Sequence, residues 1–171
     1  MRTEPTDAVI GLGSNLGDRK SNLLQAVQAL RRLGRVVGVS SLYETDPIGP
    51  PQPRYLNAAV RLATELDPAG LLEALLTVEQ RLGRTRRERW TARVLDLDIL
   101  WIRGVSLHAR DLCVPHPELR RRRFALAPLV DVAPEAGDPE TGRSYVEILA
   151  KLDRDGVDEL LGTRGGIWAE A

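Results

Sequence analysis

The sequence has very little of several residue types, and each shortage excludes a class of protein. A single cysteine, Cys113, cannot form an internal disulfide, which excludes a disulfide-framed secreted module and fits a reducing cytoplasm. No apolar run approaches the roughly 20 residues of a membrane-spanning helix. Residues 1–12 have neither the apolar stretch nor the cleavage site of a signal peptide. We therefore expect a cytoplasmic protein that makes no use of a membrane.

The chain also lacks an excess of charge of either sign. It has 24 basic and 24 acidic residues, so a general nucleic-acid-binding field is not expected. Lys20 and Lys151 are the only lysines. The other basic residues are arginines, many of them in 81–93 and 120–123, and their planar guanidinium groups suit phosphate oxygens. A composition bias of the source genome would produce the same excess.

The distribution of apolar residues predicts one domain in which helices pack on a sheet. With 171 residues, 43% of them apolar, the chain can bury a core without a disulfide or a structural metal. We expect the domain to span residues 1–171, with 1–7 and 162–171 loose. Apolar spacing, caps and turns predict strands at 8–12, 36–44, 55–64, 94–102 and near 105–112, and helices at 23–33, 68–82, after 117 and after 144. This order favours an α+β fold, with the proline-rich residues 46–53 as a loop.

The sharpest chemical signal is an Asp-Leu-Asp sequence in the predicted strand at 94–102. Asp96 and Asp98 lie two positions apart and share a face, about 6.6 Å apart along the strand. Two carboxylates on an apolar strand are costly unless something compensates them, and a divalent cation with substrate phosphates does so. The alternative is a solvent-facing edge strand with two solubilising acids.

A loop of about ten residues leads into that strand, and loops of this length are often functional. Residues 84–93 contain five arginines and no apolar periodicity. We expect these arginines to reach phosphates held at the aspartates, because metal ions and arginines together neutralise polyphosphates in phosphoryl transfer. The alternative is a solvated basic loop without a ligand.

Two other segments carry weaker signals. His116 lies between Pro115 and Pro117, which fix the backbone around it. A lone histidine is usually a helix cap or a structural group, and with Arg120–Arg123 just beyond, a phosphate contact is the alternative. Gly11–Gly17 lies between a strand and a helix, where a phosphate loop would lie, but it matches neither the G-x-G-x-x-G nor the Walker A pattern. A tight strand-to-helix turn is the better interpretation of that segment.

Several short motifs are distributed along the chain. They are GLGSNLG at 11–17, YETDPIG at 43–49, YLNA at 55–58, RVLDLDI at 93–99, VPHP at 114–117 and RRF at 122–124. Their order and spacing resemble those of the 6-hydroxymethyl-7,8-dihydropterin pyrophosphokinase family. The resemblance runs from about Val9 to Glu135, and the combination is specific although each motif alone is not.

The resemblance implies both a fold and a reaction. The family fold is a compact α+β layer structure with a ferredoxin-like core, a mainly antiparallel sheet covered by helices. Its members transfer pyrophosphate from ATP to the hydroxymethyl group of the reduced pterin, giving AMP and the pterin diphosphate, in folate biosynthesis. ATP and reduced hydroxymethylpterin are then the expected partners, without nucleic acid or membrane. We expect a monomer, with a dimer as the alternative.

The resemblance also implies roles for individual residues. Asp96 and Asp98 would hold two Mg²⁺ ions that bridge the ATP phosphates, and Arg84 and Arg93 would contact the transferred phosphates. The other ATP-binding residues would be Glu79, Arg86, Trp90, Ile99, His116 and Arg122. The pterin-binding residues would be Thr45, Ile48, Gly49, Tyr55, Asn57 and Phe124, with the pterin ring between Tyr55 and Phe124.

The chain departs from the family pattern in places, and two other functions compete with it. Asp46 and Ala92 stand where the pattern has proline. A nucleotidyltransferase also combines a Gly-Ser turn with a D-x-D strand, but there the aspartates follow the turn closely, whereas Ser14 and Asp96 are 82 positions apart. An RNA-binding module would use the arginine loop, but zero net charge and the acids beside that loop argue against it.

Overall fold

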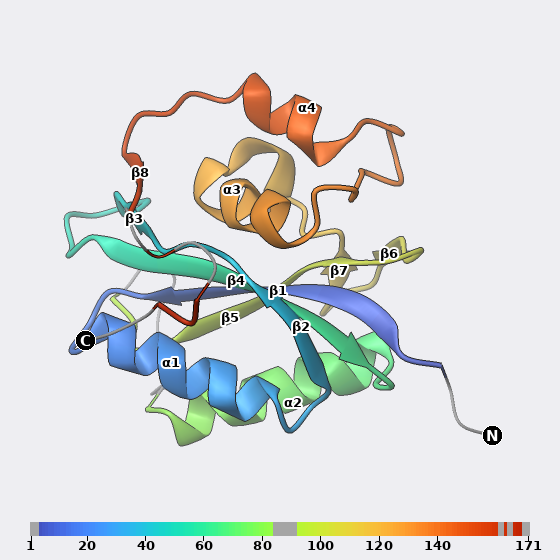
Figure 1. Cartoon of the computed structure of the whole chain (residues 1–171), viewed down its shortest axis with the longest axis horizontal. Helices are drawn as coiled ribbons and strands as arrows, with labels where there is room; N and C mark the ends of the chain where they lie inside the picture. Colours follow the sequence, from blue (N-terminus) through green and yellow to red (C-terminus); the bar gives the residue numbers. More distant parts are fainter. Residues whose placement is uncertain (1–3, 84–91, 161–162, 164–165, 169–171) are drawn as a thin grey trace.

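One antiparallel sheet with helices on both faces dominates the computed structural model, which describes residues 4–83, 92–160, 163 and 166–168 (Figure 1). The strand order is β5-β1-β4-β3-β8, and β2 pairs with β4. These strands are β1 (Thr6–Ser14), β2 (Arg35–Val39), β3 (Tyr43–Thr45), β4 (Tyr55–Thr64), β5 (Asp96–Ile102) and β8 (Val157–Glu159). A smaller sheet consists of β6 (Leu107–His108) and β7 (Cys113–Val114). The predicted α+β class is confirmed.

Three of the helices begin directly after a capping side chain. Asp18, Asp67 and Ser144 each accept a hydrogen bond from a backbone N–H of the first turn, at 3.0, 2.7 and 3.2 Å. The helices are α1 (Arg19–Leu30), α2 (Pro68–Arg81), α3 (Arg123–Val132), α4 (Tyr145–Ala150) and the short 3₁₀ helix η1 (Leu119–Arg121). The predicted starts at 68 and after 144 are therefore confirmed. No helix in the described part of the chain is both long and apolar enough to cross a membrane.

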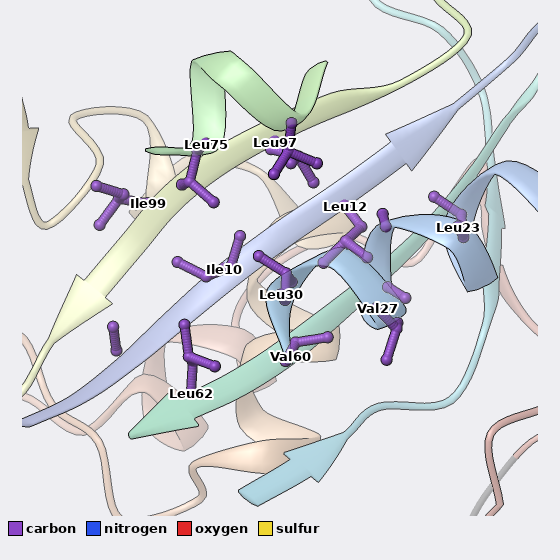
Figure 2. Packing of buried hydrophobic residues seen from close by; sticks show 14 of the residues in the cluster. Ile10, Leu12, Leu23, Val27, Leu30, Val60, Leu62, Leu75, Leu97 and Ile99 are labelled. Atoms are coloured by element: carbon purple, nitrogen blue, oxygen red, sulfur yellow. The ribbon is translucent and has the colours of Figure 1, made fainter. Parts of the chain in front are cut away.

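The larger hydrophobic core lies between the sheet and helices α1 and α2 (Figures 1 and 2). Alternate residues of the central strands point into it, because side chains along a strand alternate between faces. Among them are Ile10, Leu12, Val60, Leu62, Leu97 and Ile99, which meet Leu23, Val27, Leu30 and Leu75 of the helices. Burial of each such side chain stabilises the fold by about 1.5–3 kcal/mol. The intervening strand residues are thereby directed to the opposite face.

Helices α3 and α4 cover only part of that opposite face. Val9 of β1 packs there with Leu100 and Trp101 of β5, against apolar side chains of α3 and α4. Leu100 and Trp101 are consecutive yet join the same cluster, because the β1–β5 register shifts between Val9 and Ile10 and produces a bulge. Further along β1 the same face is open, and the candidate site lies there.

The sequence predicts one strand at 36–44, but the structure has two separate strands there, β2 and β3. Ser40 and Ser41 between them are buried. The backbone N–H of Ser40 still donates to the Ala59 oxygen at 2.9 Å, but side chains take the other bonds of the ladder. The Ser40 hydroxyl accepts from the backbone N–H of Ala59 at 2.8 Å, and the Ser41 N–H donates to a carboxylate oxygen of Asp131 at 3.2 Å. Side-chain partners distant in sequence therefore break the strand.

Near each end of the chain, described residues that we expected to be loose belong to a strand or to the core. β1 already begins at Thr6, within the segment 1–7 that we expected to be loose. Trp168, within the segment 162–171, is 1% exposed and belongs to the larger core, where its Nε1–H donates to the backbone oxygen of Ser40 at 2.9 Å. The expectation of two loose ends is wrong at these positions, because a buried indole holds the C-terminal segment against the sheet.

A network of four ion pairs lies at the end of the sheet where β1 begins. Arg61 of β4 contacts Asp7 at 2.6 Å and Glu135 at 2.7 Å, and Arg103 contacts the same two carboxylates at 3.3 and 2.8 Å. The hydrogen bond from Arg61, with the nearby Arg103, holds the pKa of Asp7 below its usual value of 3.8. The ionised form of Asp7 therefore stabilises the folded protein.

We predict that Asp7→Asn lowers the free energy of unfolding at pH 7 by about 1 kcal/mol, because asparagine carries no charge to pair with Arg61. The folded-state pKa of Asp7 is depressed, so its contribution is complete above the unfolded-state pKa and is lost as the pH falls through the folded-state value. In urea unfolding from pH 7 down to about pH 3, the free energies of unfolding of wild type and Asp7→Asn should converge. The exposed Glu65→Gln serves as control, and a difference independent of pH would contradict the assignment.

Candidate active site

Two glycines of β1 form the floor of a cleft on the face that α3 and α4 leave open. Gly13 lies between Asp96 of β5 and Asn57 of β4, and Gly11 lies beside Asp98. Directly paired residues of antiparallel strands point to the same face. Because glycine adds no side chain, the floor between the aspartates and Asn57 is flat. Of the segment 11–17, Gly11 and Gly13 are therefore strand residues, whereas Gly17 lies in the turn between β1 and α1.

The cleft has a volume of about 740 Å³, which lies within the range of small-molecule sites. Strand order places carboxylates on its β5 side and aromatic, amide and hydroxyl groups on its β4 and β3 side. The predicted site residues among its lining are Thr45, Ile48, Tyr55, Asn57, Arg93, Asp96, Asp98, His116, Arg122 and Phe124. Residues far apart in the sequence, from Gly11 to Ala125, thus meet at one cleft with two chemically different halves.

Asp96 and Asp98 carry the strongest electrostatic signal in the cleft. Arg93 contacts Asp96 at 2.6 Å. The side chain of Asp98 opens onto the cleft. Its carboxyl is surrounded by protein atoms and repelled by Asp96 and Glu79, and both effects raise its pKa, to about 7. The charges of Arg93 and Arg122 oppose this shift. Such a carboxylate pair favours a bound cation.

The donor set at this pair fits a hard divalent cation that shares its ligands with a substrate. The described residues contain no group of three or more His, Cys, Asp or Glu side chains that could hold a metal by themselves. Asp96 and Asp98 offer two carboxylates on one strand face. Magnesium is commonly bound in this way, by one or two carboxylates together with substrate phosphates.

His116 contributes a hydrogen-bond donor beside the aspartates. Its backbone N–H donates to Leu100 of β5 at 2.9 Å, which fixes it at the edge of the sheet. Its Nδ1 accepts from the backbone N–H of Glu118 at 3.2 Å. Burial, together with the positive charge of Arg122, lowers the pKa of His116 below its usual value of 6.5. The ring is thus neutral at pH 7 and presents an Nε2–H.

The other half of the cleft combines aromatic rings with an oriented amide. The Nδ2 of Asn57 donates to Oγ1 of the buried Thr45 at 2.6 Å, which directs the Asn57 carbonyl oxygen over Gly13. Phe124, at the start of α3, packs with the Arg122 guanidinium 5.8 Å from its ring centre. Tyr55 lines the same half. A flat polar heterocycle suits this arrangement.

The Asn15 side chain links three segments around the cleft by hydrogen bonds, and it was not among the site residues predicted from the sequence. Its Oδ1 accepts from the backbone N–H of Arg93 at 2.7 Å, and its Nδ2 donates to Gln52 Oε1 at 2.9 Å and to the Pro53 oxygen at 3.0 Å. The side chain is buried. One amide therefore links the turn after β1, the approach to β5 and the loop between β3 and β4.

Three predicted site residues lie outside the cleft lining. The buried Glu79 of α2 accepts from the backbone N–H of Leu97 at 2.7 Å, so it supports the strand between the two aspartates from behind. The Ile99 side chain faces the larger core, because strand alternation directs it away from the face of Asp98. Gly49 belongs to the loop but not to the lining. Arg84, Arg86 and Trp90 lie outside the described residues.

Comparison with known proteins identifies the family. The model of the 7,8-dihydro-6-hydroxymethylpterin-pyrophosphokinase family matches residues 9–134, from β1 through α3. The chain belongs to this family. As a pyrophosphokinase of this family it is an enzyme, and its use of ATP implies a divalent metal.

Bacterial relatives match nearly the whole chain. The 2-amino-4-hydroxy-6-hydroxymethyldihydropteridine pyrophosphokinase of Bacillus subtilis is 43% identical over 161 residues, covering 90% of this chain and 95% of the relative. That of Methylorubrum extorquens is 43% identical over 158 residues, covering 91% and 99%. The mitochondrial folate synthesis bifunctional protein of Pisum sativum is 41% identical over 147 residues, covering 85% of this chain but 28% of the relative.

Solved structures confirm the fold of the pyrophosphokinase. Wild-type Plasmodium falciparum HPPK-DHPS with SDX-DHP superposes with a TM-score of 0.68 at 16% identity. The superposition covers 86% of this chain and 44% of that one, so the chain spans less than half of that protein. At this identity the likeness supports the α+β architecture alone.

We predict that NMR will find the ring of His116 neutral at pH 7, with its proton on Nε2, and a titration midpoint below 6.5. Burial and Arg122 disfavour the charged ring, and the Glu118 N–H occupies Nδ1. The chain has two histidines, so ¹⁵N spectra of His108→Gln would leave a single ring to assign. A protonated Nδ1, or a midpoint above 6.5, would show that the ring is held differently.

Proposed function

We propose that this cleft transfers the pyrophosphoryl group of ATP to the hydroxymethyl group of 6-hydroxymethyl-7,8-dihydropterin, giving AMP and the pterin diphosphate for folate biosynthesis. Family membership supports the reaction. We assign the two substrates to this cleft because its two sides differ in chemistry. Charged groups that suit a polyphosphate lie on the β5 side, and groups that suit a flat heterocycle lie on the β4 side.

The β5 side would bind the phosphates. We assign Asp96 and Asp98 as the ligands of Mg²⁺, with two ions shared between the carboxylates and the ATP phosphates. When bound, such ions neutralise phosphate charge and orient the transferred group. Arg93 and Arg122 would hold phosphate oxygens through their guanidinium groups, and His116 would donate its Nε2–H to another. Arg84, Arg86 and Trp90 complete the proposed ATP site from the segment 84–91.

The β4 side would bind the pterin. Tyr55 and Phe124 offer aromatic faces to the ring, and an aromatic pair stabilises by about 0.5–1.5 kcal/mol beyond area burial. Asn57 and Thr45 would form hydrogen bonds with the polar edge, since the bond between them fixes the amide orientation before binding. Ile48 and Gly49 in the adjoining loop would border the ring.

The chain's contribution to the reaction is positioning and charge stabilisation. The pterin hydroxyl attacks the β-phosphorus in line and releases its proton to water, the bond from that phosphorus to the oxygen it shares with the α-phosphate breaks, and AMP leaves with that oxygen. Arg93 and Arg122 face the charge that develops on the phosphate oxygens, which is where fixed donors accelerate such transfers. The floor at Gly11 and Gly13 lets both substrates approach along one strand. Location in the cytoplasm and a monomeric state remain predictions.

We predict that Asp96→Asn and Asp98→Asn each abolish nearly all metal-dependent formation of AMP while the protein stays folded. Removing one of two adjacent like charges relieves repulsion in the metal-free protein, so its thermal stability should hold or rise. A coupled assay for pterin-dependent AMP formation, with circular dichroism for folding, tests this. Glu73→Gln on α2 is the control, and full activity of either aspartate variant would refute the metal assignment.

We predict that Gly13→Ala weakens pterin binding about tenfold and affects ATP less, because the added Cβ would lie 2.8 Å from Asn57 Oδ1 and displace the amide. Calorimetric titration with each ligand measures the two affinities. The control is Gly38→Ala in β2, where the added Cβ meets Val132 at an ordinary 3.8 Å. Equal pterin affinity in the two variants would place the pterin elsewhere.

A further inference from the structure

Arg54 lies outside the cleft lining, yet it connects the loop beside the cleft to the C-terminal strand. Its Nε donates to Asp46 Oδ1 at 2.9 Å, and its Nη2 donates to Asp158 Oδ2 at 2.9 Å. The same Nη2 donates to the backbone oxygen of Glu44 at 3.3 Å. One planar guanidinium group therefore holds together the end of β3, the first residue of the loop 46–53 and β8.

β8 is a firm partner for this contact because it is held on the sheet. It pairs antiparallel with β3, with Asp158 opposite Glu44. Further along the chain, Trp168 is buried in the larger core and its Nε1–H donates to the Ser40 oxygen at 2.9 Å. The C-terminal segment is thus fixed on both sides of Asp158, by the turn at Gly156 and by the indole.

The loop and the C-terminal segment also meet through their backbones. The backbone N–H of Asp46 donates to the Gly156 oxygen at 2.8 Å. Gly156 has φ +70°, and a Cβ at this position would lie 2.5 Å from Asp46 Oδ2. Glycine is required here both for its conformation and for the close approach. The first residue of the loop is therefore held by a backbone hydrogen bond in addition to the ion pair.

We propose that Arg54, acting with Asp158, is a positioning residue for the pterin half of the active site. Thr45 directly precedes Asp46, and Tyr55 directly follows Arg54, so the two contacts of Arg54 fix both ends of the loop that borders this half. The inference rests on the proposed function, which takes the Thr45 and Tyr55 side as the pterin side. Binding to groups already held in place costs less ordering.

Steady-state kinetics of Arg54→Ala and Asp158→Asn test the proposal. We expect the KM for the pterin to rise about fivefold in Arg54→Ala and about twofold in Asp158→Asn, since exposed ion pairs contribute modestly. The KM for ATP and kcat should change less than about twofold, because neither residue lines the cleft. Arg54→Lys keeps the charge but loses the planar fork, so its pterin KM should fall between wild type and Arg54→Ala.

Arg103→Ala is a matched control for the loss of ion pairs. Arg103 also contacts two carboxylates, Asp7 and Glu135, but at the other end of β1, about 20 Å along the strand from Gly13. We expect it to leave the pterin KM unchanged. Hydrogen exchange gives a second readout. The Asp46 amide, which donates to the Gly156 oxygen, and the other non-proline amides of the loop 46–53 should exchange faster in Arg54→Ala and as in wild type in Arg103→Ala.

The outcomes separate this inference from the function on which it rests. A wild-type protein that forms no AMP with the pterin would reject the proposed function and this inference with it. An active wild type with unchanged pterin KM in Arg54→Ala and Asp158→Asn overturns the inference alone, as does an equal rise in Arg103→Ala or in the KM for ATP. If Arg54→Ala does not fold, Asp158→Asn and Arg54→Lys decide by the same criterion.

Discussion

The whole site depends on a steric constraint at Gly11 and Gly13 of β1, where a side chain would crowd its neighbours on the face that the cleft occupies. A Cβ at Gly13 would lie 2.8 Å from Asn57 Oδ1, and one at Gly11 would lie 3.1 Å from the Leu100 side chain. On the opposite face, Ile10 and Leu12 of the same strand belong to the larger core. The central strand therefore packs into the larger core with one face and forms the floor of the cleft with the other. That division follows from the two-residue period of a strand.

The second constraint is electrostatic, because the site concentrates carboxylates that the protein alone neutralises only in part. Asp96, Asp98 and the buried Glu79 lie around the start of β5, and their repulsion contributes to the raised pKa of Asp98. The bond between Glu79 and the Leu97 N–H keeps that third charge in place behind the strand. Arg93 and Arg122 oppose the repulsion without cancelling it. Such an arrangement is favourable when a cation joins it, as in metal-dependent phosphoryl transfer.

The sequence predicted those parts of the structure that depend on neighbouring residues. The alternation in β5 placed Asp96 and Asp98 on one face of the strand, and capping residues marked the starts of α2 and α4. Contacts between distant residues were not predictable. Asn15 bonds partners 38 and 78 positions away, β8 was not expected, and the short helix predicted after Pro117 is η1 and not α3. The resemblance, in turn, assigned Ile99 by its place in a motif, whereas its side chain belongs to the core.

The loop between β3 and β4 begins at Asp46, one of the positions at which the chain departs from the proteins it resembles. The resemblance implies proline there, and a proline would restrict the backbone through its ring but would supply no N–H. Here that N–H donates to the Gly156 oxygen, and the carboxylate accepts from Arg54, which also holds Asp158. The first residue of the loop is therefore held by contacts with β8 and the turn before it. The same part of the chain that supports the loop beside the cleft leads on to Trp168, which belongs to the core.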